Sequence, residues 1–187
     1  MIKRGILATF VMTLVVFGGM LLAQENLKPE WFVSDFAGVM SPASKAALEN
    51  ELRAYQTKTS REIAVVTVPS LNGLEVDDFT QKLWGTWKVG DAKEDNGIIF
   101  LVAPTERKMR IQTGYGAEGL LPDITCKHIL TDTVKPYFKQ QKVDEGIRAG
   151  VTAIIVALEK EPDSKTAAPL RKNEEGAPSL VSVIVLG

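Results

Sequence analysis

Two carboxylates, Glu118 and Asp123, lie in a glycine-rich segment, GYGAEGLLPD, that directly follows an apolar strand pattern. A loop at the end of a strand is where an α/β sheet usually holds its ligand, and glycines let a backbone turn tightly or approach a ligand closely. The segment does not continue into the Lys-Ser or Lys-Thr of a phosphate-binding loop. The pattern therefore indicates a ligand site that uses carboxylates, with tight turning as the plainer explanation of the glycines.

Cys126 and His128 are the residue types of a nucleophile and its base, but their spacing argues against a catalytic pair. Residues two apart on a helix point to different sides. Cys126 falls on an apolar stripe with Ile129 and Leu130, which predicts a buried small hydrophobic side chain. His128 is the only histidine, which excludes a histidine-rich metal centre, argues against a histidine-based phosphatase and predicts a solvated surface residue.

Alternating strand and helix patterns must position these residues. Ser41 and Pro42 are suited to the cap and the first turn of a helix over about 42–58. Continuous apolar runs predict two strands that are covered on both faces. The remaining elements are predicted from the spacing of apolar residues and from turn residues. Pro136 predicts an interruption near the end of the helix that follows Pro122. The predicted elements are strands 61–69, 97–103 and 108–113, and helices 76–87, 123–137 and 143–160.

This order predicts an α/β fold, an α/β/α sandwich with a small mixed sheet that is covered by helices on both faces. Strands 97–103 and 108–113 form an antiparallel hairpin in this prediction, joined by the short PTERK link. Residues 26–40 mix aromatic residues with Pro29 and Gly38, which is typical of an extended entry strap that lies on the domain.

Both ends of the chain differ from the middle. Lys3 and Arg4, an apolar run from Ile6 to Leu22 and the small Ala23 predict a secretory signal over residues 1–23, with an uncleaved membrane anchor as the alternative. Residues 161–178 have no periodicity, which favours a flexible linker. Residues 179–187 are apolar, which fits either a short docking strand or a membrane helix that is cut short.

The composition limits the classes of function. With 45% hydrophobic and 24% charged residues, the chain has the balance of one globular domain with appendages. A formal charge of -1 provides no basic face for nucleic acid, so nucleic-acid binding is excluded from the expected partners. A single cysteine cannot form an internal disulfide, and the domain must be held by its core.

Several segments together resemble the TPM domain family, named for thylakoid acid phosphatases, a photosystem II repair protein and nicotinic-receptor modulators. The segments are VSDFAGVMS, REIAVVTVPSLNG, the long run LWGTWKVGDAKEDNGIIFLVAPTERKMRIQTGYGAEGLLPD, and EGIRAGV. The resemblance covers about residues 31–159 within a domain of 24–160. It implies export to the periplasm or another extracytoplasmic space, association with a membrane or a membrane-protein complex, and binding of a divalent cation, chiefly Ca²⁺.

Calcium takes six to eight oxygen ligands, which requires several acidic residues on adjacent loops. The family motifs place four candidates in this sequence: Asp35, Asp95, Glu118 and Asp123. The loop DAKEDNG lacks the spacing of an EF-hand. Each candidate also has a structural explanation, because Asp35 could cap a turn, Asp95 could begin one, and Asp123 could favour a helix start.

Two functions remain open at this point. The first is an exported accessory factor that binds a divalent cation and assists the assembly or maintenance of membrane proteins. The second, which the resemblance also implies, is a metal-dependent acid phosphatase acting on a phosphorylated substrate, in which a bound cation would activate water. The sequence singles out no nucleophile or general acid, so catalytic residues are not assigned and the first function is preferred. A purely structural domain with a vestigial site is the third possibility, and it would show neither metal dependence nor turnover.

Overall fold

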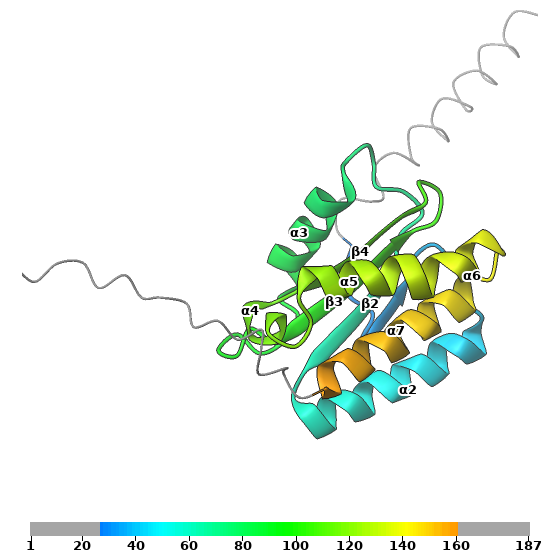
Figure 1. The fold of residues 1–187 in the computed structure, drawn as a ribbon. Helices are drawn as coiled ribbons and strands as arrows, with labels where there is room; N and C mark the ends of the chain where they lie inside the picture. Colours follow the sequence, from blue (N-terminus) through cyan, green and yellow to red (C-terminus); the bar gives the residue numbers. More distant parts are fainter. Residues whose placement is uncertain (1–26, 161–187) are drawn as a thin grey trace, which may run out of the picture.

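Continuous apolar sequences form the centre of a four-stranded sheet (Figure 1). The computed structural model describes residues 27–160 of the 187-residue chain. The central strands β2 (Glu62–Thr67) and β3 (Gly97–Ala103) are flanked by β1 (Val33–Asp35) and β4 (Lys108–Thr113), in the order β1-β2-β3-β4. Every residue of β3 is buried, which confirms that helices cover both faces of this strand.

The directions of the strands decide which loops meet. β1, β2 and β3 run parallel, whereas β4 runs antiparallel to β3. Glu62 pairs with Gly97 and Ile98 pairs with Thr113, so the starts of β2 and β3 lie beside the end of β4. We call this end of the strands, where β2 and β3 begin, the amino edge. The opposite side, where β1 ends at Asp35, is the carboxyl edge.

Helices cover the sheet on both faces, so the predicted α/β/α sandwich is confirmed. Two helices, α2 (Pro42–Thr59) and α7 (Val143–Glu159), run side by side over one face in Figure 1. The segments α5 (Asp123–His128), η1 (Ile129–Val134) and α6 (Lys135–Lys139) lie next to them. Helix α3 (Val76–Trp87) covers the other face. The sheet thus separates two hydrophobic clusters.

The helix after Pro122 contains the interruption that Pro136 predicts. Proline has no backbone N–H and its ring collides with the preceding turn, so a regular α-helix cannot continue through it. The chain forms the π-helical segment η1 before Pro136, in which the Lys135 N–H donates to the carbonyl of Leu130, five residues earlier. One long element therefore runs from Asp123 to Lys139 with a wider turn in its middle.

Two short elements were not predicted. The entry strap contributes the strand β1, whose pairing is extended by a 2.7 Å hydrogen bond from the Val65 N–H to the Phe32 carbonyl. A single helical turn, α4 (Tyr115–Glu118), follows β4 inside the glycine-rich loop. Elements of three or four residues carry too few positions for periodicity to reveal them.

The predicted signal or anchor (1–23), linker (161–178) and apolar end (179–187) lie outside the described residues. Within residues 27–160, no helix has both the length and the apolar character that a membrane crossing requires.

Candidate functional site

Carboxylates from three parts of the chain line a cleft at the amino edge of the sheet. The cleft has a volume of about 470 Å³ and opens beside the end of β4. We call it the acidic cleft. Its five carboxylate residues are Asp77 and Asp78 at the start of α3, Asp95 before β3, Glu118 in α4 and Asp123 at the start of α5.

The acidic cleft exists because β4 is antiparallel. Its end returns the glycine-rich loop to the side of the sheet where β3 begins, next to Asp95. Helix α3 packs across β4, and the Gln112 Nε2 donates a 2.9 Å hydrogen bond to Gln81 on that helix. Carboxylates from 77 to 123 therefore meet at one edge, although long stretches of sequence separate them.

Asp95 holds the two loops of the cleft together. Its backbone adopts a left-handed conformation with φ of 47°, which aspartate tolerates better than most residues. Its Oδ2 accepts a 3.0 Å hydrogen bond from the Tyr115 N–H, and its carbonyl accepts a 2.9 Å bond from the Gly116 N–H. One carboxylate thus caps α4 and faces the cleft at the same time.

The glycines of the loop are required by close approach rather than by positive φ. A Cβ at Gly114 would lie 2.1 Å from the Asp95 carbonyl oxygen, and one at Gly116 would lie 1.9 Å from the Glu94 carbonyl oxygen. Side chains cannot occupy such positions, so these two glycines let the backbone of the loop touch the 91–96 loop. Gly119 has open space around it and carries no such requirement.

The structure brings three of the four predicted ligands together and leaves Asp35 apart. Asp95, Glu118 and Asp123 line the acidic cleft, whereas Asp35 ends β1 at the carboxyl edge. Since β2 extends five residue steps between the two edges, Asp35 lies about 17 Å from the level of the cleft along the strands alone, and it is also separated from β4 by two intervening strands. The predicted set of four therefore does not form one site.

Asp35 caps a turn, as its alternative explanation proposed. Its Oδ1 accepts a 3.2 Å hydrogen bond from the Val39 N–H, and its Oδ2 accepts a 3.0 Å bond from the Met40 N–H. The Thr67 hydroxyl donates to the same carboxylate. These bonds fix the chain between β1 and α2 and occupy both carboxylate oxygens.

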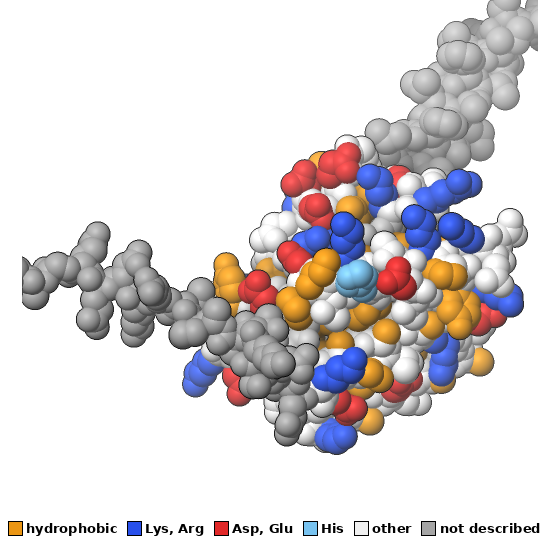
Figure 2. Space-filling model, in the orientation of Figure 1, with side chains coloured by type: hydrophobic (Ala, Val, Ile, Leu, Met, Phe, Trp, Pro, Cys, Tyr) orange, Lys and Arg blue, Asp and Glu red, His pale blue; other side chains and the backbone are white. Residues whose placement is uncertain are grey.

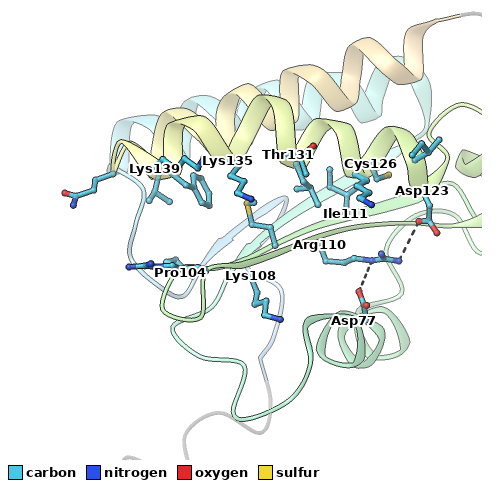
Figure 3. Close-up of a pocket in the computed structure, with 18 residues that line it drawn as sticks. Asp77, Pro104, Lys108, Arg110, Ile111, Asp123, Cys126, Thr131, Lys135 and Lys139 are labelled. Carbon is cyan, nitrogen blue, oxygen red and sulfur yellow. Dashed lines mark ion pairs between the residues drawn. The ribbon is translucent and has the colours of Figure 1, made fainter.

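Arg110 places a positive charge between two of the cleft carboxylates. Its Nε lies 3.3 Å from Asp77 Oδ1, and one terminal nitrogen lies 3.7 Å from Asp123 Oδ1 (Figure 3). The two acidic side chains are 69% and 78% exposed, so these ion pairs add little to stability. Their effect is to neutralise part of the local negative charge.

Sequence reasoning missed Arg110, Asp77 and Asp78. The two aspartates are in the first turn of α3, where a favourable interaction with the helix dipole explains them adequately. Arg110 alternates with apolar residues in β4, as an outward-facing strand residue would. All three residues share one cleft only because α3 packs on β4, and this packing leaves no local pattern in the sequence.

The cleft is rich in oxygen donors, but these donors are widely spaced. Among residues 27–160, no three His, Cys, Asp or Glu side chains lie close enough together to hold one metal ion directly. Exposed side chains such as Glu118 and Asp123 can change rotamer, and calcium completes its ligand shell with water. The cleft therefore offers the donor type that hard cations prefer, but its described side chains do not converge on one point.

Neither Cys126 nor His128 belongs to a catalytic arrangement in the described residues. Cys126 is buried, and burial followed by the Asp123 charge raises the pKa of its thiol to about 12. The predicted buried role of this residue is confirmed. His128 is an exposed side chain whose Nδ1 lies 3.1 Å from Asp132 Oδ2, which confirms its predicted surface position.

Comparison with known proteins identifies what the chain resembles. The TPM domain matches residues 33–157. The solution NMR structure of the N-terminal domain of a protein from P. gingivalis is 38% identical, has a TM-score of 0.64, and aligns over 68% of this chain and 81% of that chain.

Two further solution structures share the fold. The N-terminal domain of the cg2496 protein from Corynebacterium glutamicum is 17% identical with a TM-score of 0.55, over 76% of this chain and 90% of that one. The BA42 protein from Bizionia argentinensis is 21% identical with a TM-score of 0.56, over 64% and 81%. No functionally curated protein shows a significant match to the chain.

Proposed function

The chain belongs to the TPM domain family, and we propose that it binds a divalent cation, with calcium as the expected ion, in the acidic cleft. The observation that carries the proposal is the convergence of five carboxylates on one cleft with a single arginine. Carboxylate oxygens are the ligands that calcium prefers. Asp95, Glu118 and Asp123 would contribute the carboxylates, and Asp77 and Asp78 would add negative charge beside them.

The expected affinity is low. Sites that bind calcium partly through water, with flexible exposed carboxylates, belong to the class with dissociation constants of about 10⁻⁴ to 10⁻³ M. Such a site is occupied where calcium is abundant, as it is outside the cytoplasm. This matches the export that the sequence of residues 1–23 predicts.

We further propose that the protein acts as an accessory factor for membrane proteins, in assembly or maintenance. The support is the signal or anchor pattern at the amino end and the apolar pattern over residues 179–187, both read from the sequence. A domain tethered at a membrane surface could present a cation-dependent surface to a neighbouring membrane protein. Release of the protein from the envelope fraction without detergent would contradict membrane association.

The metal-dependent phosphatase remains the competing function, and no specific observation favours it. The raised pKa of the Cys126 thiol, about 12, keeps this group protonated and unsuited to nucleophilic attack. The side chain of His128 is 65% exposed and does not line the acidic cleft. A phosphatase would therefore depend entirely on water activated by the proposed cation.

The test is calorimetric titration of the full chain with calcium. The variant Glu118→Gln with Asp123→Asn removes two cleft charges, and the control Glu51→Gln with Glu145→Gln removes two exposed charges elsewhere. We expect saturable binding in the wild type and the control, and its loss in the cleft variant. Equal binding by both variants would place the ion elsewhere, and no binding by the wild type would refute the proposal.

A phosphomonoester assay separates the two functions. A binding protein shows no turnover with or without calcium. Turnover that disappears with chelator and in the cleft variant would establish the phosphatase instead.

A further inference from the structure

A second and larger cavity adjoins the acidic cleft at Arg110, which lines both. It has a volume of about 1100 Å³ and runs between β4 and the long element α5–η1–α6, as Figure 3 shows. We call it the basic groove. Its volume slightly exceeds the range of about 300–1000 Å³ that is usual for small-molecule sites. Six cationic side chains line it: Arg107, Lys108, Arg110, Lys127, Lys135 and Lys139.

Most of the positive charge in the basic groove is unpaired. Lys108 and Arg110 form ion pairs, with Glu75 at 3.4 Å and with Asp77 at 3.3 Å. The remaining four cations of the groove form no ion pair with any of residues 27–160. In Figure 2, Lys and Arg side chains gather on this face beside the single histidine. The groove therefore has positive charge available for an anion.

The floor of the basic groove is apolar. Ile111 and Cys126 are buried there, whereas Met109, Leu130 and Phe138 are only partly buried. All five side chains belong to the larger hydrophobic cluster or pack against it. Covering the exposed part of such a floor with an apolar group releases water and is favourable. A ligand that complements the groove therefore combines an anionic group with an apolar body.

The unpaired charge is concentrated toward one end of the groove. Arg107 immediately precedes β4, whose first residue, Lys108, pairs with Ala103 at the carboxyl edge. Helix α6, which carries Lys135 and Lys139, forms this end of the long element. In Figure 3, Lys139 lies at the same end of the groove as Pro104, and Asp123 lies at the opposite end. An anionic group would bind near the carboxyl edge, with its apolar body extending along the floor.

The shape of the groove suits a long and thin apolar body. The long element spans 139 - 123 = 16 residue steps, or roughly 24 Å at 1.5 Å per residue. Apolar side chains line the groove from both walls, with Met109 on β4 and with Leu130 and Phe138 on the long element. A thin chain is contacted from both sides here, which favours it over a broad protein surface.

An acyl chain satisfies this groove better than an extended peptide. Helix α5 packs on β4, and the side chain of Ile111 is fully buried beneath it, so β4 does not offer an open edge for backbone pairing. An extended peptide on the apolar floor would bury backbone N–H and C=O groups without partners, which is costly. An acyl chain has no such groups.

We propose that the basic groove binds a single-chain anionic amphiphile, that is, an acyl chain with an anionic head group. Arg107, Lys135 and Lys139 contact the head group, and the chain lies on the apolar floor. A free fatty acid and a lysophospholipid share this chemistry. The inference goes beyond the cation site proposed for the acidic cleft and does not depend on it, so its test is carried out in the presence of chelator.

The experiment is calorimetric titration of the full chain with dodecanoate below its critical micelle concentration. The variant Lys135→Gln with Lys139→Gln removes two head-group charges from the exposed surface of α6. The matched control, Lys82→Gln with Lys160→Gln, removes two exposed charges outside the groove. A second groove variant, Thr131→Trp, introduces a large side chain at an exposed position of the lining. Circular dichroism verifies that all three variants are folded.

We expect saturable binding of dodecanoate by the wild type and the control. For a head group about 6 Å from each ammonium group, the lysine variant should bind about tenfold more weakly at low salt and about threefold more weakly at 0.15 M salt. Thr131→Trp should weaken binding by obstructing the chain at either salt concentration.

Three further ligands separate the contributions of chain and charge. Octanoate should bind at least about tenfold more weakly than dodecanoate, because each buried methylene contributes about fourfold to affinity. Dodecyltrimethylammonium, with the same chain length and the opposite charge, should also bind at least about tenfold more weakly. Lauroyl lysophosphatidylglycerol should bind in the same groove, and its affinity relative to dodecanoate identifies which of the two sources is preferred.

Three results would overturn the proposal. The first is no binding of either anionic amphiphile by the wild type. The second is equal binding by both groove variants and the control, which would place the ligand elsewhere on the chain. The third is equally tight binding of dodecyltrimethylammonium, which would exclude recognition of the anionic group. If phosphatidylglycerol vesicles bind in a groove-dependent way while the single-chain ligands do not, the groove is a membrane-contact surface instead.

Discussion

Arg110 competes with a cation for the acidic cleft, and its replacement by glutamine should tighten calcium binding. The guanidinium group lies 3.3 Å from Asp77 and 3.7 Å from Asp123. It therefore neutralises carboxylate charge that a bound ion would use, and it takes up space beside that ion. Glutamine retains most of the length and polarity of the side chain and removes the charge. The change therefore isolates the electrostatic contribution.

The magnitude follows from the separation of the charges. A calcium ion about 2.4 Å from the Asp123 carboxylate would lie about 6 Å from the guanidinium. A divalent and a monovalent cation at this distance repel each other by about 1.4 kcal/mol in water, which corresponds to a factor of ten in affinity. At about 0.15 M salt, screening leaves roughly half of this energy, or about threefold.

The assay is calorimetric titration of wild type and Arg110→Gln at low salt and at physiological salt. The control is Arg53→Gln on α2, which removes the same charge from a side chain remote from the cleft. The expected gain in affinity is about tenfold at low salt, about threefold at physiological salt, and absent in the control. Unchanged or weaker binding by Arg110→Gln would refute the placement of the ion beside Asp123.

Four further predictions concern individual residues. Gly114→Ala should lower the melting temperature, at a cost of about 1–3 kcal/mol from the backbone collision, while Gly119→Ala should be tolerated in the same thermal denaturation. Asp35→Ala should lower the free energy of unfolding by about 1–3 kcal/mol in urea titrations and leave calcium binding unchanged. Cys126 should react with a thiol reagent only after denaturation, because its thiol is buried and its pKa is raised to about 12. The hydrogen bond from the Leu71 backbone lowers the pKa of Glu106, with a further contribution from Ser70. Glu106→Gln should therefore reduce the free energy of unfolding at neutral pH. The difference from wild type should vanish as the pH falls from about 4.5 through the lower folded-state pKa.

Local patterns were sufficient for the large elements of the fold. The apolar run of β3 was predicted with the observed bounds, 97–103, and β4 was likewise predicted at 108–113. The cap at Ser41 is present, with its hydroxyl accepting a hydrogen bond from the Ser44 N–H. Such features succeed because each depends on residues a few positions apart. β1 was missed because its pairing with β2 stabilises a segment with no period of its own.

The candidate site was only partly predictable for the same reason. Asp35 and Asp95 both lie beside strands in the sequence, but Asp35 ends β1 whereas Asp95 precedes the start of β3. Because these strands run parallel, the two residues lie at opposite edges. The antiparallel direction of β4 then brings Glu118 and Asp123 to the amino edge. Asp77 joined the cleft through the packing of α3 on β4, which no pattern within α3 reveals.

The sequence by itself determined the membership of the TPM domain family, the helices and central strands, the buried role of Cys126 and the exclusion of a histidine-rich centre. These depend on residue type and short spacing. Only the tertiary structure decided which carboxylates share a cleft and that Arg110 lies between Asp77 and Asp123 there. The physical reason is that charge and backbone hydrogen bonding act across space, between residues whose proximity depends on strand direction and helix packing.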